Sequence, residues 1–324
     1  MTLGVGVIGT GVMGAEHVRL LREETAGAAV VAICDADAAR AQQVAQGAAA
    51  FTDPMALISD SRVQAVVIAS PDTTHAALAL ACIAAGKPVL CEKPLAATAE
   101  QALQVVAAEV ALGRRLVTTG YMRRFDPAYA AMKRAAGAGE IGEAVLLHNP
   151  HRNAAAPDWF TGAMSVTNSF VHEIDISRWL LGAEMTRAQV HAAPGGDPLL
   201  ITMETDRGQI ISTEVNMNAR YGYHVHAQLV GRAGTIEMAP PTATLTNRAG
   251  QHGHDWPDNW VPRFRDAYRI QMNAWVRSVT EGVPVGASAW DGYVATAIAE
   301  QVVAALQTGQ ATALHLHPRP ALYP

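Results

Sequence analysis

The run Gly9-Thr10-Gly11-Val12-Met13-Gly14 restricts the fold of this chain more than any other feature. It follows an apolar, strand-like segment, Leu3–Ile8, and precedes a helical segment from about Ala15 to Arg22. In this strand, turn, helix context, the first glycine permits a tight turn, the second lets the backbone approach a pyrophosphate, and the third lets helix and strand pack closely. Free amides at the helix N-terminus favour the pyrophosphate. The motif therefore predicts a dinucleotide-binding domain.

An acidic residue follows the second predicted strand. This strand, Ala29–Cys34, ends at Asp35, where a carboxylate would accept hydrogen bonds from the ribose hydroxyls. A 2′-phosphate at that position would meet a like charge, whereas Arg40, close by in the sequence, would soften the repulsion. The pattern favours NAD over NADP as cofactor.

Strand and helix signals keep alternating up to Gly120. Apolar runs predict strands over Val63–Ala69, Val89–Cys91 and Leu116–Thr119, with helices over Ala76–Ala85 and about Ala99–Leu112 between them. Such alternation predicts an α/β domain with a doubly wound parallel sheet, a Rossmann fold.

The remainder of the chain has a different pattern. A helix ending at Gly137 is followed by segments in which apolar and polar residues alternate, as in half-buried strands. Asp206-Arg207-Gly208 is a plausible hairpin turn between two of them. The predicted strands are Ala144–His148, Ala188–Ala193, Leu199–Thr205, Gln209–Met217, His224–Val230 and Thr235–Met238. A polar loop over Ala239–Pro262 and helices over about Arg263–Glu281 and Trp290–Thr308 follow. We therefore expect a Rossmann domain over 1–120 and an α+β domain with an open, mostly antiparallel sheet over 121–324.

Glu92, Lys93 and Pro94 follow the predicted strand Val89–Cys91 at its carboxyl end. Ligands of open parallel sheets bind at that edge, so Lys93 is well placed to meet a bound cofactor. The alternative is a surface lysine in a turn. Burial of Cys91 in the core explains that thiol better than a role as nucleophile, because no base is arranged for it.

A helix predicted over about Val166–Leu181 carries a polar stripe. Asn168, His172, Asp175 and Trp179 are spaced by four, three and four residues and share one face. Such a stripe on an otherwise apolar helix is costly unless it lines a wet cleft. The alternative is a solvated face with a capped histidine.

Composition excludes several classes of function. Half of the 324 residues are hydrophobic, 16% are charged, and the formal net charge is −5, which predicts a globular protein that binds neither nucleic acid nor membrane. Three cysteines without CxxC spacing indicate reduced thiols, and no basic leader precedes the first strand, so we expect a cytoplasmic protein. His252, His254 and Asp255 lack a second cluster of ligands, so we expect no metal.

Three motifs in this order resemble the glucose-fructose oxidoreductase/inositol dehydrogenase/MocA family: Gly9–Gly14, Glu92-Lys93-Pro94 and Val171-His172-Glu173-Ile174-Asp175. Gly120–Asp126, His151-Arg152-Asn153 and the run from Arg263 to Tyr268 are similar to the inositol dehydrogenase branch. The resemblance implies that Lys93 is the active-site lysine, that His172 accepts the proton, and that Asn168 replaces the acid usual four residues earlier. It implies further that the polyol is bound by Arg123, His151, Asn153, Asp175 and Tyr223. The motif positions and the resemblance together assign the cofactor contacts to Gly9, Gly11, Met13, Gly14, Asp35, Ser70, His75, Glu92 and Lys93.

The resemblance implies NAD-dependent oxidation of a polyol secondary alcohol, myo-inositol or a related cyclitol, to the ketone. In that reaction His172 takes the hydroxyl proton, and Lys93 stabilises negative charge on the same oxygen. The implied partners are a small polyol and further copies of the chain, in a homodimer or homotetramer. The alternatives are a dehydrogenase or reductase of another sugar or cyclitol in secondary metabolism, and a regulator that senses NAD(H) without turnover.

Overall fold

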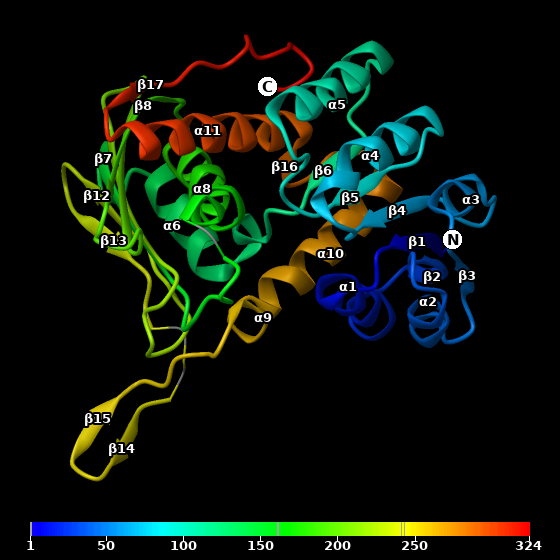
Figure 1. Ribbon diagram of the computed structural model, residues 1–324, viewed down its shortest axis with the longest axis horizontal. Coiled ribbons are helices and arrows are strands. Elements are labelled where there is room, and N and C mark those ends of the chain that lie inside the picture. The colour runs from blue at the N-terminus through cyan, green and yellow to red at the C-terminus, as the bar shows by residue number, and fades with distance from the viewer. Residues whose placement is uncertain (1, 161, 241, 243) are drawn as a thin grey trace. The chain divides into compact units, whose positions relative to one another are not determined.

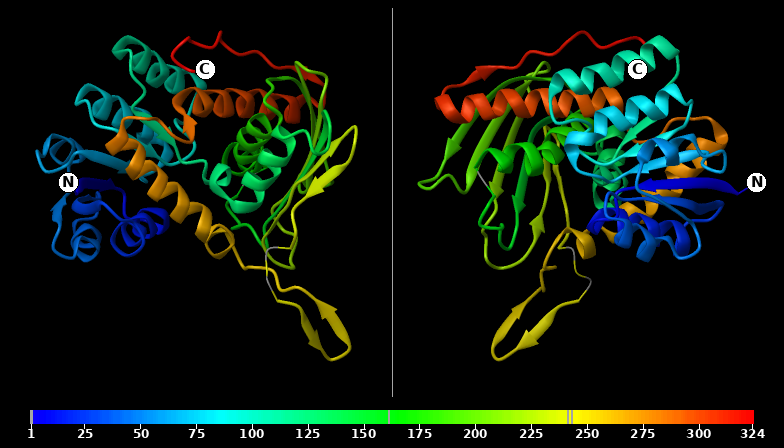
Figure 2. Two further views of the ribbon diagram at one scale, coloured as in Figure 1. Left: turned by 180° about the vertical axis from the view of Figure 1, so that it is seen from behind. Right: turned by 45° about the vertical axis from the view of Figure 1, so that its right-hand side comes forward.

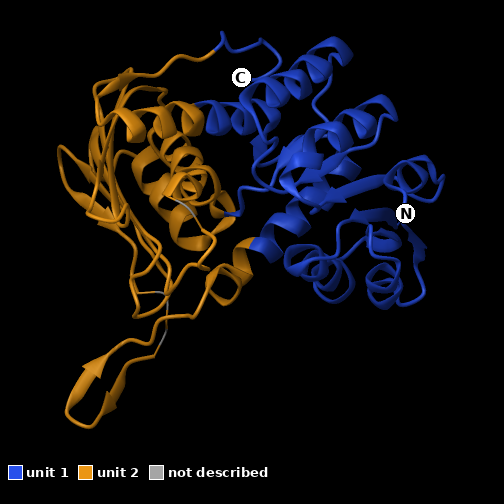
Figure 3. Ribbon diagram, in the orientation of Figure 1, with its two compact units in different colours: residues 1–122, 268–297, 317–324 blue, residues 123–267, 298–316 orange. Residues whose placement is uncertain are grey.

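The computed structural model describes residues 2–160, 162–240, 242 and 244–324. They group into two compact units, one of residues 1–122, 268–297 and 317–324 and the other of residues 123–267 and 298–316 (Figure 3). The first unit thus includes residues far beyond the N-terminal third. The predicted domain boundary after residue 120 stays a prediction.

The first unit contains a seven-stranded sheet in the order β16-β6-β5-β4-β1-β2-β3 (Figure 1). All neighbours are parallel except β16, which pairs antiparallel with β6. The strands are β1 (Leu3–Ile8), β2 (Ala28–Cys34), β3 (Ala49–Phe51), β4 (Ala65–Ile68), β5 (Val89–Cys91), β6 (Val117–Thr119) and β16 (Ala287–Ser288). The predicted doubly wound sheet is confirmed, with β1 and β5 at their predicted bounds.

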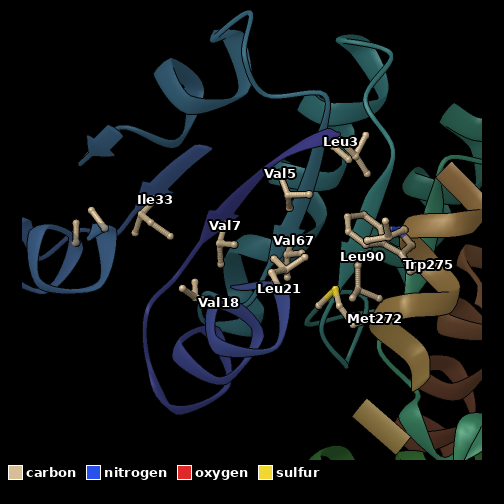
Figure 4. Packing of buried hydrophobic residues seen from close by; sticks show 14 residues of the cluster. Leu3, Val5, Val7, Val18, Leu21, Ile33, Val67, Leu90, Met272 and Trp275 are labelled. Carbon is tan, nitrogen blue, oxygen red and sulfur yellow. The ribbon is translucent and has the colours of Figure 1, made fainter. Parts of the chain in front are cut away.

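Helices are packed on this sheet because apolar residues project from both of its faces. On one face Val5 and Val7 meet Val18 of α1 and Trp275 of α10 in one buried cluster (Figure 4). On the other face, a side chain at Gly6 would meet Leu57 of α3. The helices that belong wholly or largely to this unit are α1 (Val12–Glu23), α2 (Ala38–Ala45), α3 (Pro54–Ser59), α4 (His75–Ala84), α5 (Ala99–Leu112) and α10 (Arg265–Glu281). A 3₁₀ turn, η1 (Asp72–Thr74), precedes α4, and α11 (Ala289–Thr308) begins in this unit.

Three elements between β2 and β4 were not predicted from the sequence: α2, β3 and α3. These elements are short. Because α2 buries only Ala41 and Ala45, its sequence lacks the regular spacing of apolar residues by which a helix is predicted. Local capping defines them instead: the Asp37 side chain accepts from the amides of residues 39 and 40, and the Asp53 side chain accepts from the Met55 amide.

The second unit contains an eight-stranded sheet in the order β13-β12-β7-β10-β9-β8-β17, with β11 paired to β7. It is mostly antiparallel, as predicted, and β7 and β10 form its parallel pair. The predicted strand over His224–Val230 is interrupted and becomes β11 and β12. The strands are β7 (Ala144–Arg152), β8 (Met185–Ala192), β9 (Leu199–Thr205), β10 (Ile210–Asn216), β11 (His224–Val225), β12 (Gln228–Gly231), β13 (Thr235–Glu237) and β17 (Thr312–Ala313).

One prediction for this unit is wrong: the segment over Ala239–Pro262 is not all loop. It contains a separate antiparallel hairpin of β14 (Thr246–Arg248) and β15 (Gln251–Gly253), and it ends in the short helix α9 (Trp260–Arg263). The hairpin extends away from the eight-stranded sheet of its unit (Figure 2). Its strands are exposed on both sides, so their residues lack the apolar alternation by which a strand is predicted. Residues 241 and 243 of the predicted loop lie outside the described residues.

The predicted helix over Val166–Leu181 is not one continuous α-helix. A short turn, α7 (Gly162–Met164), leads into a π-helical segment, η3 (Ser165–Phe170), and α8 (Val171–Leu181) follows. Asn168 therefore lies in the π-helical segment, whereas His172 and Asp175 lie on α8. The predicted common face of Asn168, His172 and Asp175 stays a prediction. The helix α6 (Pro127–Gly137) packs against α8 in the same unit.

All three cysteines are free and buried, as predicted for reduced thiols. Burial raises the pKa of the Cys34 thiol to about 11 and that of the Cys82 thiol to about 12. In the part of the chain that the structure describes, no helix combines the length and the apolar character needed to cross a bilayer.

Candidate functional site

The three glycines of the first turn have three different surroundings. Gly9 has a φ of +90°, and a Cβ there would lie 2.5 Å from the Ala69 carbonyl oxygen. A Cβ on Gly14 would lie 1.9 Å from the Gly9 carbonyl oxygen, so helix and turn are in contact. Around Gly11, no described residue other than its own neighbours along the chain has an atom within 4 Å of the Cβ position. This is the arrangement that a pyrophosphate needs: a tight turn, close packing behind it, and open space at the α1 N-terminus, whose Gly11 cap makes no side-chain hydrogen bond.

Asp35 lies at the carboxyl end of β2 and is tied to that turn. Its Oδ2 accepts hydrogen bonds from the Thr10 amide at 2.8 Å and the Thr10 hydroxyl at 2.6 Å, and its Oδ1 accepts one from the Asp37 amide at 2.9 Å. Burial alone would raise its pKa, but these hydrogen bonds and the charge of Arg40 lower it below its ordinary value. Asp35 is therefore an anion beside the glycine-rich turn, which fits the predicted ribose contact.

His75 connects the ends of β4 and β5. The ring is buried, with Nε2 2.8 Å from the Ser70 carbonyl oxygen and Nδ1 2.7 Å from the Pro94 carbonyl oxygen. Each ring nitrogen thus lies against a backbone carbonyl oxygen, so His75 connects the loop that carries Ser70 with the loop that carries Lys93. Met13, also predicted at the cofactor, is half-buried in the first turn of α1. Whether these residues contact the cofactor stays a prediction.

Glu92 and Lys93 follow β5 at its carboxyl end, as predicted. Lys93 is half-buried, whereas Glu92 is buried and pairs with a residue that the sequence analysis did not single out. His17, on α1, places Nε2 2.7 Å from Glu92 Oε1. One sequence signal could have identified His17: it lies three residues after Gly14, on the helix that starts at the glycine-rich turn.

In the second unit, three of the predicted substrate residues lie in one buried cluster. Arg123 pairs with the carboxylate of Glu173, and His151 Nδ1 lies 3.0 Å from Glu173 Oε2. The Tyr223 ring packs edge-on against His151, with ring centroids 5.9 Å apart. The Arg123 guanidinium also lies over the ring of Phe264, 5.5 Å from its centroid. The structure therefore brings Arg123, His151 and Tyr223 together around an acid that the sequence analysis had assigned no role.

The charges in this cluster are mutually stabilised. Burial opposes the charged forms of Glu173 and Arg123, but each group stabilises the charge of the other. Arg123 and His151 lower the pKa of the Glu173 carboxyl below its ordinary value, and Glu173 raises the pKa of Arg123. Burial raises the pKa of Tyr223 to about 12. The cluster holds an ion pair and a neutral phenol, a set of donors and acceptors suited to hydroxyl groups.

The remaining predicted residues of this unit lie on α8, in η3 and directly after β7. Asp175 on α8 accepts two hydrogen bonds from Arg124, at 2.6 and 3.0 Å, and Arg124 too had no role assigned from the sequence. His172 on α8 is buried, and Asn168 in η3 is half-buried. Asn153 follows β7, and its amide Nδ2 lies 3.5 Å from Met217 Sδ. The residue roles assigned by resemblance stay predictions.

The whole chain matches known oxidoreductases. Residues 3–121 match a family described as an oxidoreductase family with an NAD-binding Rossmann fold, and residues 133–314 match its C-terminal alpha/beta domain. Inositol 2-dehydrogenase 1 of Saccharopolyspora erythraea is 51% identical over 335 residues, which cover 100% of this chain and 99% of that protein. Inositol 2-dehydrogenase of Rubrobacter xylanophilus is 41% identical, covering 99% of this chain and 96% of that protein.

A solved structure has the same fold over its full length. The myo-inositol dehydrogenase from Lactobacillus casei, in complex with NAD(H) and myo-inositol, matches with a TM-score of 0.96 at 29% identity, and all of both chains is covered. The scyllo-inositol dehydrogenase from the same organism matches with a TM-score of 0.89 at 20% identity, which shows the shared fold.

Proposed function

The chain belongs to the Gfo/Idh/MocA oxidoreductase family, and from this premise we propose that it is an NAD-dependent inositol 2-dehydrogenase. The observation that carries the proposal is full-length identity of 51% to an inositol 2-dehydrogenase. The match to the inositol dehydrogenase structure with bound NAD(H) and myo-inositol supports both the cofactor and the substrate class.

The residues of the first unit fit NAD. The open space at Gly11, the α1 N-terminus and the anionic Asp35 would hold the pyrophosphate and the adenosine ribose. When bound, NAD accepts the hydride from the carbinol carbon.

The chain's own residues handle the proton and the developing charge. In the proposed mechanism His172 takes the proton of the substrate hydroxyl as general base, and the Lys93 ammonium stabilises negative charge on that oxygen. The predicted polyol ligands are Arg123, His151 and Tyr223, whose cluster offers charged and neutral hydrogen-bonding groups, together with Asn153 and Asp175. A polyol offers several hydroxyl groups to such donors and acceptors, whereas a simple aliphatic alcohol offers one.

The decisive experiment is NADH formation by the purified protein over a panel of myo-inositol, scyllo-inositol, aldoses, ethanol and lactate. We expect oxidation of myo-inositol or a close cyclitol and no measurable turnover of ethanol or lactate. Lys93→Ala and His172→Ala should each lose at least about a hundredfold in turnover, and His172→Ala should retain NADH binding. Equal turnover of lactate and inositol, or a fully active His172→Ala variant, would contradict the proposal.

Two alternatives are decided by the same panel. Preference for an aldose over every inositol would identify a dehydrogenase of another sugar. Tight NADH binding without turnover of any substrate would identify an NAD(H)-sensing regulator on the same fold.

We propose further that the protein works in the cytoplasm as a homodimer or homotetramer. Free buried thiols are typical of a reducing compartment. The outer face of the eight-stranded sheet carries the exposed apolar side chains Leu200 and Ile210, which favours assembly through that face. Sedimentation of the purified protein measures the subunit count, and a monomer at all concentrations would contradict assembly.

A further inference from the structure

We propose that His17 is a positioning residue for the reaction: by holding Glu92 as a buried anion, it keeps the neighbouring Lys93 in its ammonium form. The inference rests on the proposed function, in which that ammonium stabilises negative charge on the substrate oxygen. It assigns a role to a histidine that lies 75 positions before its partner in the sequence.

The geometry of the pair is that of a strong hydrogen bond in a dry site. His17 Nε2 and Glu92 Oε1 are 2.7 Å apart, and their side chains are 1% and 9% exposed. His17 belongs to α1, the helix whose N-terminus adjoins the glycine-rich turn, and Glu92 follows β5 directly. The pair therefore ties the cofactor-binding helix to the segment that carries the lysine.

His17 is the hydrogen-bond donor of the pair. Because a carboxylate can only accept, His17 Nε2 is the donor in this bond. Its other nitrogen, Nδ1, is buried and has no hydrogen-bond partner among the described residues. Nε2 therefore makes the only hydrogen bond recorded for this ring among the described residues. The ring is packed edge-on against Tyr268 of α10, with centroids 6.1 Å apart, which adds no charge.

Burial alone would neutralise Glu92. Burial raises the pKa of its carboxyl, but the bond with His17 and the positive charge of Lys93 lower it below its ordinary value. Cys91 is a further titratable neighbour, and burial, reinforced by Glu92, raises the pKa of its thiol. Without the His17 donor, the balance for Glu92 moves towards the protonated form.

The Glu92 carboxylate is held beside the Lys93 backbone. The Lys93 amide donates a hydrogen bond to Glu92 Oε2 at 3.3 Å. A Cβ on Gly120, which follows β6, would lie 3.1 Å from both Glu92 Cα and Glu92 Oε2, so glycine at that position leaves the carboxylate its room. The charge of Lys93 lowers the pKa of Glu92, and an anion in the adjacent residue in turn favours the ammonium of Lys93 over the free amine.

The test measures the lysine directly. The pH dependence of trace acetylation of Lys93 by acetic anhydride, read by mass spectrometry, reports its protonation without any substrate. We compare wild type, His17→Leu, Glu92→Gln and His17→Gln, whose side-chain amide can donate in place of Nε2. We expect the labelling midpoint to fall by at least about one pH unit in the Leu and Glu92→Gln variants, and to stay within about 0.3 unit of wild type in His17→Gln.

Kinetics provide the second readout. With myo-inositol, His17→Leu should lower kcat at least about tenfold and move the pH–rate profile, while the Kd for NADH changes less than about threefold. If His17→Leu fails to fold, the isosteric Glu92→Gln variant carries the test. Identical labelling midpoints in wild type and Glu92→Gln, or an equal loss in His17→Gln and His17→Leu, would overturn the inference. Labelling needs no turnover, so a wild type that fails to oxidise inositol counts against the proposed function alone.

Discussion

Cofactor preference is the prediction that the structure defines most sharply. Asp35 is held by three hydrogen bonds, two from Thr10 and one from the Asp37 amide, and its pKa is below its ordinary value. Replacing it by Asn removes the charge and leaves a carbonyl oxygen that can still accept from Thr10. We therefore expect Asp35→Asn to keep the turn and to lose discrimination against NADP.

The magnitude follows from Coulomb's law. Two unit charges about 4 Å apart repel by about 4 kcal/mol at an effective dielectric constant of about 20. The Asp35 side chain is 11% exposed and Arg40 Nε lies 3.9 Å from its Oδ1, so we reduce this to about 2 kcal/mol. Since about 1.4 kcal/mol corresponds to a factor of ten, wild type should bind NADPH about 30-fold more weakly than NADH, and Asp35→Asn should remove most of that factor.

Fluorescence titration of both reduced cofactors measures the two affinities. Asp37→Asn is the matched control, because that carboxylate lies two residues later in the same loop but accepts from the Ala39 and Arg40 amides at the start of α2. Its ratio of affinities should stay within about twofold of wild type. Equal affinities in wild type, or an unchanged ratio in Asp35→Asn, would refute the assignment of Asp35.

Three further predictions concern the second unit and the chain end. Asn168→Asp should raise turnover or move the pH–rate profile upward, because a carboxylate stabilises the imidazolium four residues later; an unchanged profile with a raised KM for inositol would make Asn168 a substrate ligand instead. Glu173→Ala should lower the unfolding free energy by ~3–5 kcal/mol, measured by urea titration, because it leaves the Arg123 guanidinium buried without its carboxylate. The lowered pKa of Glu173 gives a stabilisation that is present above about pH 4.3 and lost as pH falls below it, so melting temperatures of wild type and variant should converge in acid. Tyr323→Phe should cost about 1–3 kcal/mol, since the hydroxyl donates to buried Glu109 Oε2 at 2.6 Å; no change in melting temperature would contradict this.

Features decided by neighbouring residues were predicted well. The glycine-rich turn, the strand ends at Asp35 and at Glu92, and the hairpin turn at Gly208, whose φ is +75°, follow from local backbone chemistry. Elements without an apolar period were missed, among them α2 and the β14–β15 hairpin. The π-helical segment at Asn168 was missed because its residues carry the same apolar spacing as an ordinary helix.

The sequence alone thus determined the family, the cofactor class and the position of each motif, because these depend on residues that are adjacent or one turn apart. Only the tertiary structure decided which charged side chains pair. His17 meets Glu92, Arg123 meets Glu173 and Arg124 meets Asp175 across separations of 75, 50 and 51 residues. No local pattern specifies such partners; they are selected when the packed strands and helices bury the charges, since a buried charge is stable only beside a group that satisfies it.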